Sequence, residues 1–425
     1  MVEVRGQSIR HYGGGKRRRG GGVRSGMRCV IYPCLTFAAV CSFSVLLRRQ
    51  WQFAPRETPP VPQETASPSA PVVAFAISVT SLELPTASTM LDSAEVLIQS
   101  IRAACKLSRY RCEALAFTLP SVSQEGRQHL EGMGWRVVEK DLPVAVEDIE
   151  NETYRKHVVK SGCCGANEFI KLHAYTLTQY HRVMHVDADT LMLHPMDELM
   201  ESNASLVYTT DPAMATKGSK ALPVQGGFLL VRPDLGVYDE LRAIQDPHNY
   251  VHVVCFRQGD WKVGPGWRQS HIGYFYGGAT IQGLLAYYYN IIAPGNATEV
   301  DRCVYNHMSD SDECRSERYT VIATTEAETA AKSPEERNTD RGGSVRGPTD
   351  DRGAVRTPSA IKSVHFTQSC MKPWLCGRVA GREEEGSCPL LREAWREGRR
   401  RVLESKGLPL TEACVKGSYK SIPRL

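Results

Sequence analysis

The chain has 425 residues, of which 42% are hydrophobic and 23% charged, so it can bury the core of one large or two modest domains. Its net charge of +5 comes largely from basic runs near both ends, and no basic face with interleaved aromatic residues occurs. These features argue against nucleic-acid binding, because membrane topology accounts for the first basic run.

Residues 29–47, "CVIYPCLTFAAVCSFSVLL", form an uncharged apolar run that is long enough to cross a bilayer as one helix. More positive charge precedes the run than follows it, which predicts that the N-terminus stays in the cytoplasm. A cleaved signal peptide is the alternative, but the run is long for one and no clear cleavage site follows. We therefore expect a basic tail (1–28), a transmembrane signal-anchor (29–47) and a flexible stem (48–71) rich in Pro, Ser and Thr.

Two further features agree with a lumenal domain. N-glycosylation sequons begin at Asn151, Asn203 and Asn296. Eleven cysteines follow the apolar run, and in an oxidising lumen they predict disulfides with one cysteine left over. A cysteine-based metal site is the weaker interpretation, because no CxxC pair occurs. These observations predict a single-pass type II protein of the Golgi or ER membrane.

Beyond the stem, strand and helix patterns alternate, which predicts an α/β domain with a mainly parallel sheet. The strands are predicted at 72–80, 112–120, 135–140, 182–186, 205–210 and 226–234. The helices are predicted at 93–107, 123–134, 165–180, 237–245 and 279–290. Residues 325–358 are polar and nearly free of large apolar side chains, so they predict a disordered insertion. The catalytic domain would then comprise 72–324 and 359–425, the second part ending in a Cys-rich, basic C-terminal extension.

Asp187 and Asp189 follow the predicted strand 182–186, at the end of the strand where open α/β sheets bind ligands. A helix cap would explain one carboxylate but not two. An EF-hand is excluded because Leu191 and Met192 stand where an oxygen ligand and a glycine belong. Two carboxylates on alternate residues can reach one divalent cation, with substrate phosphates completing its shell, as is usual for Mg²⁺ and open to Mn²⁺.

The segment "FIKLHAYTLTQYHRVMHVDADTLMLHPMDEL" resembles the core of the glycogenin-like glycosyltransferases, family 8. Three later segments resemble further motifs of that family in the same order: "PVQGGFLLVRPD", "GGATIQGLLAYYYN" and "VHFTQSCMKPW". The resemblance covers roughly residues 72–374 and is closest in look to the plant and algal membrane-anchored branch. It implies a GT-A nucleotide-diphospho-sugar transferase fold, a mainly parallel sheet with helices on both faces.

The resemblance also implies a set of site residues. Asp187, Asp189 and His365 match the family's metal ligands, and an imidazole beside two carboxylates suits Mn²⁺ better than Mg²⁺. Lys171 and Lys372 match basic residues that face the diphosphate and the donor sugar, whose leaving group needs a metal and a cation. The donor site would comprise Lys372, Lys171, Gln225, Gly226 and Thr80, and the catalytic residues would be Gln282 and Lys171.

Two positions depart from the family pattern. Gln225 replaces an asparagine and keeps the amide, whereas Ile281 replaces an aspartate and leaves the amide of Gln282 on the expected face. A retaining reaction can use a covalent intermediate or a front-face attack. We favour the front-face route, because no carboxylate nucleophile is evident.

These inferences predict a retaining, Mn²⁺-dependent transferase that moves a sugar of the glucose, glucuronic acid or galactose type. The donor would be a UDP-sugar and the acceptor a lumenal glycan, lipid or protein. The alternative is a non-catalytic lumenal protein that binds a sugar nucleotide or glycan on a decayed transferase fold, which the loss of a carboxylate at Ile281 favours. The presence of all three metal ligands and both lysines favours the enzyme.

Overall fold

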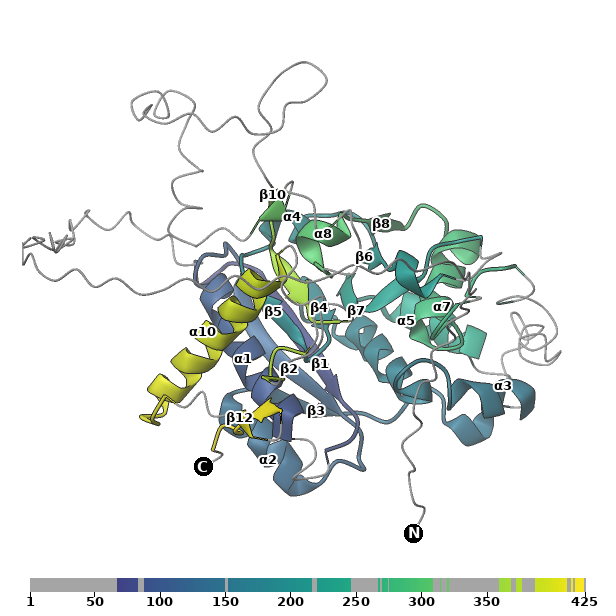
Figure 1. Ribbon diagram of the computed structural model, residues 1–425. Helices are drawn as coiled ribbons and strands as arrows, with labels where there is room; N and C mark the ends of the chain where they lie inside the picture. Colours follow the sequence, from purple (N-terminus) through teal and green to yellow (C-terminus); the bar gives the residue numbers. More distant parts are fainter. Residues whose placement is uncertain are drawn as a thin grey trace, which may run out of the picture. The chain divides into compact units, whose positions relative to one another are not determined.

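The computed structural model describes most of the folded part of the chain (Figure 1). The described residues are 67–82, 88–149, 152–215, 220–245, 267, 270–273, 275–308, 314, 319–320, 359–367, 372–376, 387–410, 414–415 and 417–423. The predicted tail, signal-anchor and insertion, with residues 48–66 of the predicted stem, lie outside the described residues. Among the residues that are described, none of the helices has the length and apolar character needed to cross a membrane.

A seven-stranded sheet forms the centre of the described unit, in the order β3-β2-β1-β4-β7-β6-β8. Its strands are β1 (Val72–Val79), β2 (Arg111–Thr118), β3 (Arg136–Glu139), β4 (Arg182–Val186), β6 (Leu206–Thr210), β7 (Val224–Val231) and β8 (Ala297–Glu299). Neighbouring strands pair in parallel, except that β7 runs antiparallel to both β4 and β6. The prediction of a mainly parallel α/β sheet is confirmed.

The other elements surround this sheet or extend it. The helices are α1 (Ser88–Cys105), α2 (Gln124–Met133), η1 (Val146–Asp148), α3 (Glu152–Val158), η2 (Gly165–Thr176), α4 (Asp197–Met200), η3 (Pro212–Met214), α5 (Leu235–Gln245), α7 (Ile281–Tyr287), η5 (Tyr288–Ile292), α8 (Arg302–Tyr305) and α10 (Cys388–Ser405). Three two-stranded sheets pair β5 (Thr190–Met192) with β11 (Ser363–His365), β9 (Tyr319–Thr320) with β10 (Ser359–Ala360), and β12 (Cys414–Val415) with β13 (Ser418–Tyr419).

Alternate residues of β1 face opposite sides of the sheet, and each side is covered. Ala74 and Ala76 belong to an apolar cluster that contains side chains of η2 and α7. Val73, Phe75 and Ile77 belong to a second cluster, which contains side chains of α1 and α2. A strand buried on both faces reads as a continuous apolar run, which is why this strand could be predicted from its sequence.

Two helices differ from the sequence prediction. The predicted helix at 165–180 is η2, a 3₁₀ helix that ends at Thr176. It starts at Gly165, which has a φ of 58° and where a Cβ would lie 2.5 Å from the carbonyl oxygen of Val159. A side chain at residue 165 would therefore collide with the preceding turn. The helix predicted from residue 93 begins five residues earlier, at Ser88.

The basic C-terminal extension contains an 18-residue helix, α10, that was not predicted. Leu391, Trp395 and Val402 recur at helical spacing and are buried in a third apolar cluster with Val96 of α1. Figure 1 shows α10 alongside α1, and the two helices are in contact. Arginine and glutamate side chains pair with one another on the rest of the helix, and they masked its apolar stripe in the sequence.

The disulfide prediction is confirmed at three described pairs and is wrong at one pair of neighbours. The bonds join Cys105 to Cys112, Cys303 to Cys314 and Cys376 to Cys414. Cys163 and Cys164, which were expected to form disulfides, are exposed free thiols. Both residues lie in the turn that precedes η2, which leaves their side chains exposed.

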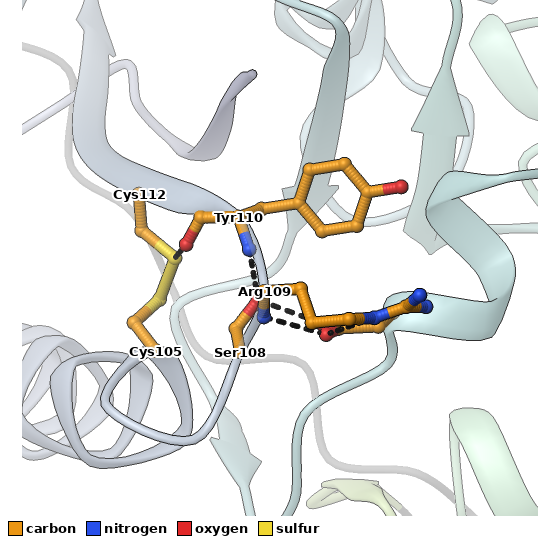
Figure 2. Close-up of a disulfide and its surroundings, with 6 residues drawn as sticks. Cys105, Ser108, Arg109, Tyr110 and Cys112 are labelled. Atoms are coloured by element: carbon orange, nitrogen blue, oxygen red, sulfur yellow. Dashed lines mark hydrogen bonds and ion pairs between the residues drawn. A yellow bond between two sulfur atoms is a disulfide. The ribbon is translucent and has the colours of Figure 1, made fainter. Parts of the chain in front are cut away.

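The Cys105–Cys112 disulfide closes the turn between α1 and β2 (Figure 2). A carboxylate of α4 holds the same turn: Ser108 Oγ donates to Asp197 Oδ1 at 2.6 Å, and the Arg109 backbone N–H donates to Asp197 Oδ2 at 2.8 Å. Because α4 lies about ten residues after β4, these bonds connect the segment after β4 to the turn that leads into β2.

Candidate functional site

The two predicted carboxylates lie at the carboxyl end of β4, and the third predicted ligand reaches them through strand pairing. β5 follows Asp189 directly and pairs antiparallel with β11, so that His365 lies opposite Thr190. The backbone N–H of Phe366 donates to the carbonyl of Asp189 at 3.0 Å. The pairing therefore brings together residues that are about 180 positions apart in the sequence.

Asp187, Asp189 and His365 form one compact group of ligand atoms. His365 Nε2 lies 3.1 Å from Asp189 Oδ1 and 3.8 Å from Asp187 Oδ2. One ligand atom from each residue lies within 4.8 Å of the other two. A nitrogen donor that faces two carboxylate oxygens at these distances fits a divalent cation such as Mn²⁺. His365 is buried, which holds its ring in place.

Gly227 of β7 lies directly against this group. A Cβ at residue 227 would be 2.6 Å from His365 Cε1 and 2.7 Å from Asp187 Oδ2. Atoms that are not bonded do not approach so closely, so a side chain here would displace two of the three candidate ligands. The space that surrounds the ligand atoms thus depends on the absence of a side chain at Gly227.

Lys171 of η2 holds Asp187 from the protein side. Its Nζ lies 2.6 Å from Glu168 Oε2, 2.9 Å from Asp187 Oδ1 and 3.1 Å from the carbonyl oxygen of Gly226. Burial by itself would lower the pKa of Lys171, but the charges of Asp187 and Glu168 raise it above its ordinary value. Lys171 is therefore a permanently charged, buried ammonium group.

Lys372 holds Asp189 in the way that Lys171 holds Asp187. Its ammonium group contacts the Asp189 carboxylate and donates to the carbonyl of Phe366 at 2.8 Å. Burial would raise the pKa of Asp189, yet the charges of His365 and Lys372 hold it well below its usual range. Burial opposes ionisation of Asp187 as well, and Lys171 together with His365 lowers its pKa. Both carboxylates are consequently charged at neutral pH.

A cavity of about 270 Å³ opens beside the ligand group. Of the predicted site residues, five line it: Thr80, Lys171, Asp187, Asp189 and Lys372. Trp374 also lines the cavity, and its ring centroid lies 6.5 Å from that of Trp395 in α10. The candidate metal ligands, the lysines and the cavity thus form a single candidate site.

Three other predicted site residues, Gln225, Gly226 and Gln282, do not line the cavity. Gln225 is buried, and its Oε1 accepts the N–H of Gly227. Gly226 donates its N–H to Gln282 Oε1 at 3.1 Å. Ile281 is buried in the apolar cluster shared by η2 and α7. The amide of Gln282 is therefore oriented by β7, whereas Ile281 serves the core.

Glu168, Ser78 and His185 belong to the site but were not predicted. Glu168 stands three residues before Lys171, a helical spacing from which its pairing with the lysine could have been inferred. His185 is buried on β4, and its Nε2 lies 2.7 Å from Oγ of Ser78, a cavity-lining residue of β1. A role for His185 could have been inferred from its position on β4, two residues before Asp187.

The buried His185 is expected to make the protein less stable in mild acid. Burial, followed by the charge of Lys171, lowers the pKa of His185 from 6.5 to about 3. Between these values the unfolded chain binds a proton that the folded protein does not, so the free energy of unfolding decreases as the pH falls below 6.5. We expect this group to contribute a loss of about 1 kcal/mol between pH 7.5 and 5.5.

Thermal unfolding of the purified protein at both pH values tests this expectation. His185→Gln should show a shallower pH dependence than the parent, whereas His129→Gln, a change at a partly exposed histidine of α2, should keep the parent slope. An unchanged slope in His185→Gln would show that His185 is not the responsible group.

No known protein family and no curated protein matches this sequence. Among solved structures, the chain is similar to the bifunctional glycosyltransferase WbbM, with 14% identity and a TM-score of 0.40 over 79% of this chain and 51% of that one. It is similar to the galactosyltransferase LgtC in complex with donor and acceptor sugar analogs, with 14% identity and a TM-score of 0.38 over 80% and 98%. A third similar structure is mouse xyloside xylosyltransferase 1, with 12% identity and a TM-score of 0.37 over 70% and 98%. The chain spans about half the length of WbbM.

Proposed function

We propose that the protein is a glycosyltransferase that uses a UDP-sugar donor and Mn²⁺. One observation carries this proposal: two carboxylates and an imidazole meet at the carboxyl end of the central sheet, between two lysines and beside a cavity. Ligands of open α/β sheets bind at this end of the strands. The resemblance of the sequence motifs to glycosyltransferase family 8 supports the same activity.

Charge balance in the site suits an anionic donor. The charges of Lys171 and Lys372 offset those of Asp187 and Asp189, which they contact. A divalent cation held by Asp187, Asp189 and His365 would therefore make the site positive overall. Such a cation supplies positive charge to the oxygens of a diphosphate leaving group. The negative charges of a nucleotide diphosphate would then offset this positive charge, with Lys372 at the cavity wall facing the phosphates.

The proposed reaction retains the configuration of the transferred sugar by front-face attack. Gln282 contacts β7 at Gly226, whose carbonyl binds Lys171, and an amide is a poor nucleophile. Gly226 fixes the amide through a hydrogen bond to Gln282 Oε1, so that Gln282 would orient the sugar and not bond to it. Lys171 would keep Asp187 in position throughout, because it is buried and held by three partners.

A donor screen on the purified protein tests the proposed activity through release of free UDP. We expect Mn²⁺-dependent release from at least one of UDP-glucose, UDP-glucuronic acid and UDP-galactose, and a loss of roughly 1,000-fold in Asp189→Ala. Gln282→Ala should lower turnover while leaving Mn²⁺ affinity unchanged. Glu201→Gln, a change at an exposed carboxylate, is the control and should behave like the parent. Binding of UDP without turnover of any donor would favour the alternative, a non-catalytic sugar-nucleotide-binding protein.

We also propose that the catalytic domain lies in the lumen of the Golgi or ER, anchored by residues 29–47. Asn203 and Asn296, the asparagines of two sequons, are exposed and thus accessible to glycosylation. In the full chain expressed in a eukaryotic cell, N-glycosidase treatment should reduce the apparent mass, and Asn203→Gln and Asn296→Gln should each remove part of that shift. A protein that shows no shift and extracts without detergent would contradict the proposed location.

A further inference from the structure

Two adjacent thiols lie on the wall of the same cavity but outside the ligand group described above. Cys163 and Cys164 immediately precede η2 and are both exposed. Their sulfurs are 3.0 Å apart, and Cys163 Sγ lies 3.6 Å from Glu168 Oε1. One ligand atom from each of these three residues lies within 4.8 Å of the other two. The arrangement therefore offers two sulfur ligands and one oxygen ligand to a single ion.

Glu168 adds a fixed carboxylate ligand to the two exposed cysteines. Its side chain is only 12% exposed, and its second oxygen is held at 2.6 Å by the ammonium group of Lys171. The carboxylate is thus fixed in orientation by a buried partner before any ion arrives. A preoriented third ligand is the kind of support that metal sites require from groups around them.

We propose that Cys163, Cys164 and Glu168 bind one thiophilic divalent cation, of which Zn²⁺ is the natural example. Thiolates select soft or borderline ions, whereas the Asp187, Asp189 and His365 group suits a harder one, so the two sites differ in preference. The charges are also favourable: two thiolates and Glu168 carry three negative charges, of which Zn²⁺ offsets two, and Glu168 shares the charge of Lys171 with Asp187. Binding releases the two thiol protons.

The geometry needs only a small adjustment. Zn–S bonds of about 2.3 Å in a tetrahedral arrangement place the two sulfurs about 3.8 Å apart, less than 1 Å more than in the structure. Both side chains are exposed and can rotate toward solvent. With three protein ligands, a fourth position would be left for water or a bound molecule.

Cadmium titration of the purified full-length protein tests the site without measuring sugar transfer. One equivalent of Cd²⁺ per chain should bind and give a thiolate-to-cadmium charge-transfer band. Added Zn²⁺ should displace the Cd²⁺ and abolish the band. Cys163→Ser and Cys164→Ser should each weaken Cd²⁺ binding by roughly 100-fold, and Glu168→Gln by roughly 10-fold. Asp189→Asn should keep the band, because Asp189 pairs with His365 and Lys372 and belongs only to the other site.

Two measurements keep the result interpretable. A thiol titration before metal addition should find two more reactive thiols in the parent than in the Cys163→Ser/Cys164→Ser double variant, and the cysteine variants should match the parent in thermal unfolding. Cys255→Ser, outside the described residues, is the cysteine control and should retain the band. A Cd²⁺ band that survives in the double variant, or a parent in which the two cysteines are already oxidised to each other, would overturn the proposal. A protein that releases no UDP but still gives the Cd²⁺ band would contradict the proposed transferase activity and leave the thiolate site supported.

Discussion

Gly227→Ala is expected to lower the affinity for Mn²⁺ by at least about 100-fold, although it adds a single methyl group. The new Cβ would stand 2.6 Å from His365 Cε1 and 2.7 Å from Asp187 Oδ2. Neither neighbour can easily retreat: His365 is buried, and Asp187 is held by Lys171 at 2.9 Å. The methyl group must therefore separate the nitrogen ligand from the oxygen ligand.

Titration of the full chain with Mn²⁺, followed by electron paramagnetic resonance of the free ion, measures this affinity. Gly132→Ala provides a matched control, because residue 132 is exposed in α2 and a Cβ there would meet nothing within 4 Å. Alanine favours a helix over glycine, so this control should bind Mn²⁺ normally and be slightly more stable. Unchanged Mn²⁺ binding in a folded Gly227→Ala protein would show that the ion does not occupy the Asp187, Asp189 and His365 group.

Lys171→Met is expected to lower the free energy of unfolding by about 3–5 kcal/mol, the usual cost of leaving a buried charge without its partner. Methionine is similar in length, so the change removes the charge and its three bonds with little change in volume. Glu168 and Asp187 would then both lose the ammonium group that they contact in the parent. Activity should fall as well, because Asp187 would lose the group that positions it.

Urea unfolding of the parent and of Lys171→Met tests the assignment at two pH values. Unpaired, partly buried carboxylates have a raised pKa and take up protons more readily in the folded state than in the unfolded state, so the deficit of the variant should shrink between pH 7 and pH 5. Glu168→Gln added to Lys171→Met should restore part of the stability. Lys156→Met, a change at an exposed lysine paired with Glu152, should have no measurable effect. A deficit that is the same at both pH values would assign the loss to packing.

The sequence predicted the sheet well and its surroundings less well, for identifiable reasons. β1, β4 and β7 are buried along most or all of their length, and apolar residues make up most of each strand. In α10, by contrast, eight of the 18 residues are arginine or glutamate, several of which pair with one another, and the apolar stripe of Leu391, Trp395 and Val402 is sparse. The free thiols of Cys163 and Cys164 were mistaken for disulfide partners, because counting cysteines says nothing about which of them meet.

Some residues of the candidate site could likewise be identified from the sequence, and others could not. Asp187 and Asp189 could be identified from local sequence, since two carboxylates after a buried strand are unusual without a cation. His365 carried no local signal, and only its motif resemblance suggested a role. The structure brings it to the carboxylates through the pairing of β11 with β5. Glu168 was overlooked because its significance depends on Lys171, whose buried ammonium group it shares with Asp187.

By itself, the sequence determined the strand and helix alternation, the carboxylate pair and the motif pattern, because each of these depends only on residues that are close together along the chain. Only the tertiary structure decided which distant groups meet: His365 with the two aspartates, Lys372 with Asp189, Gly227 against the ligands, and Glu168 beside two thiols. The physical reason is that a cation site depends on distances of a few ångströms between charged atoms. Those distances are set by strand pairing and side-chain burial across the whole domain, and not by spacing along the chain.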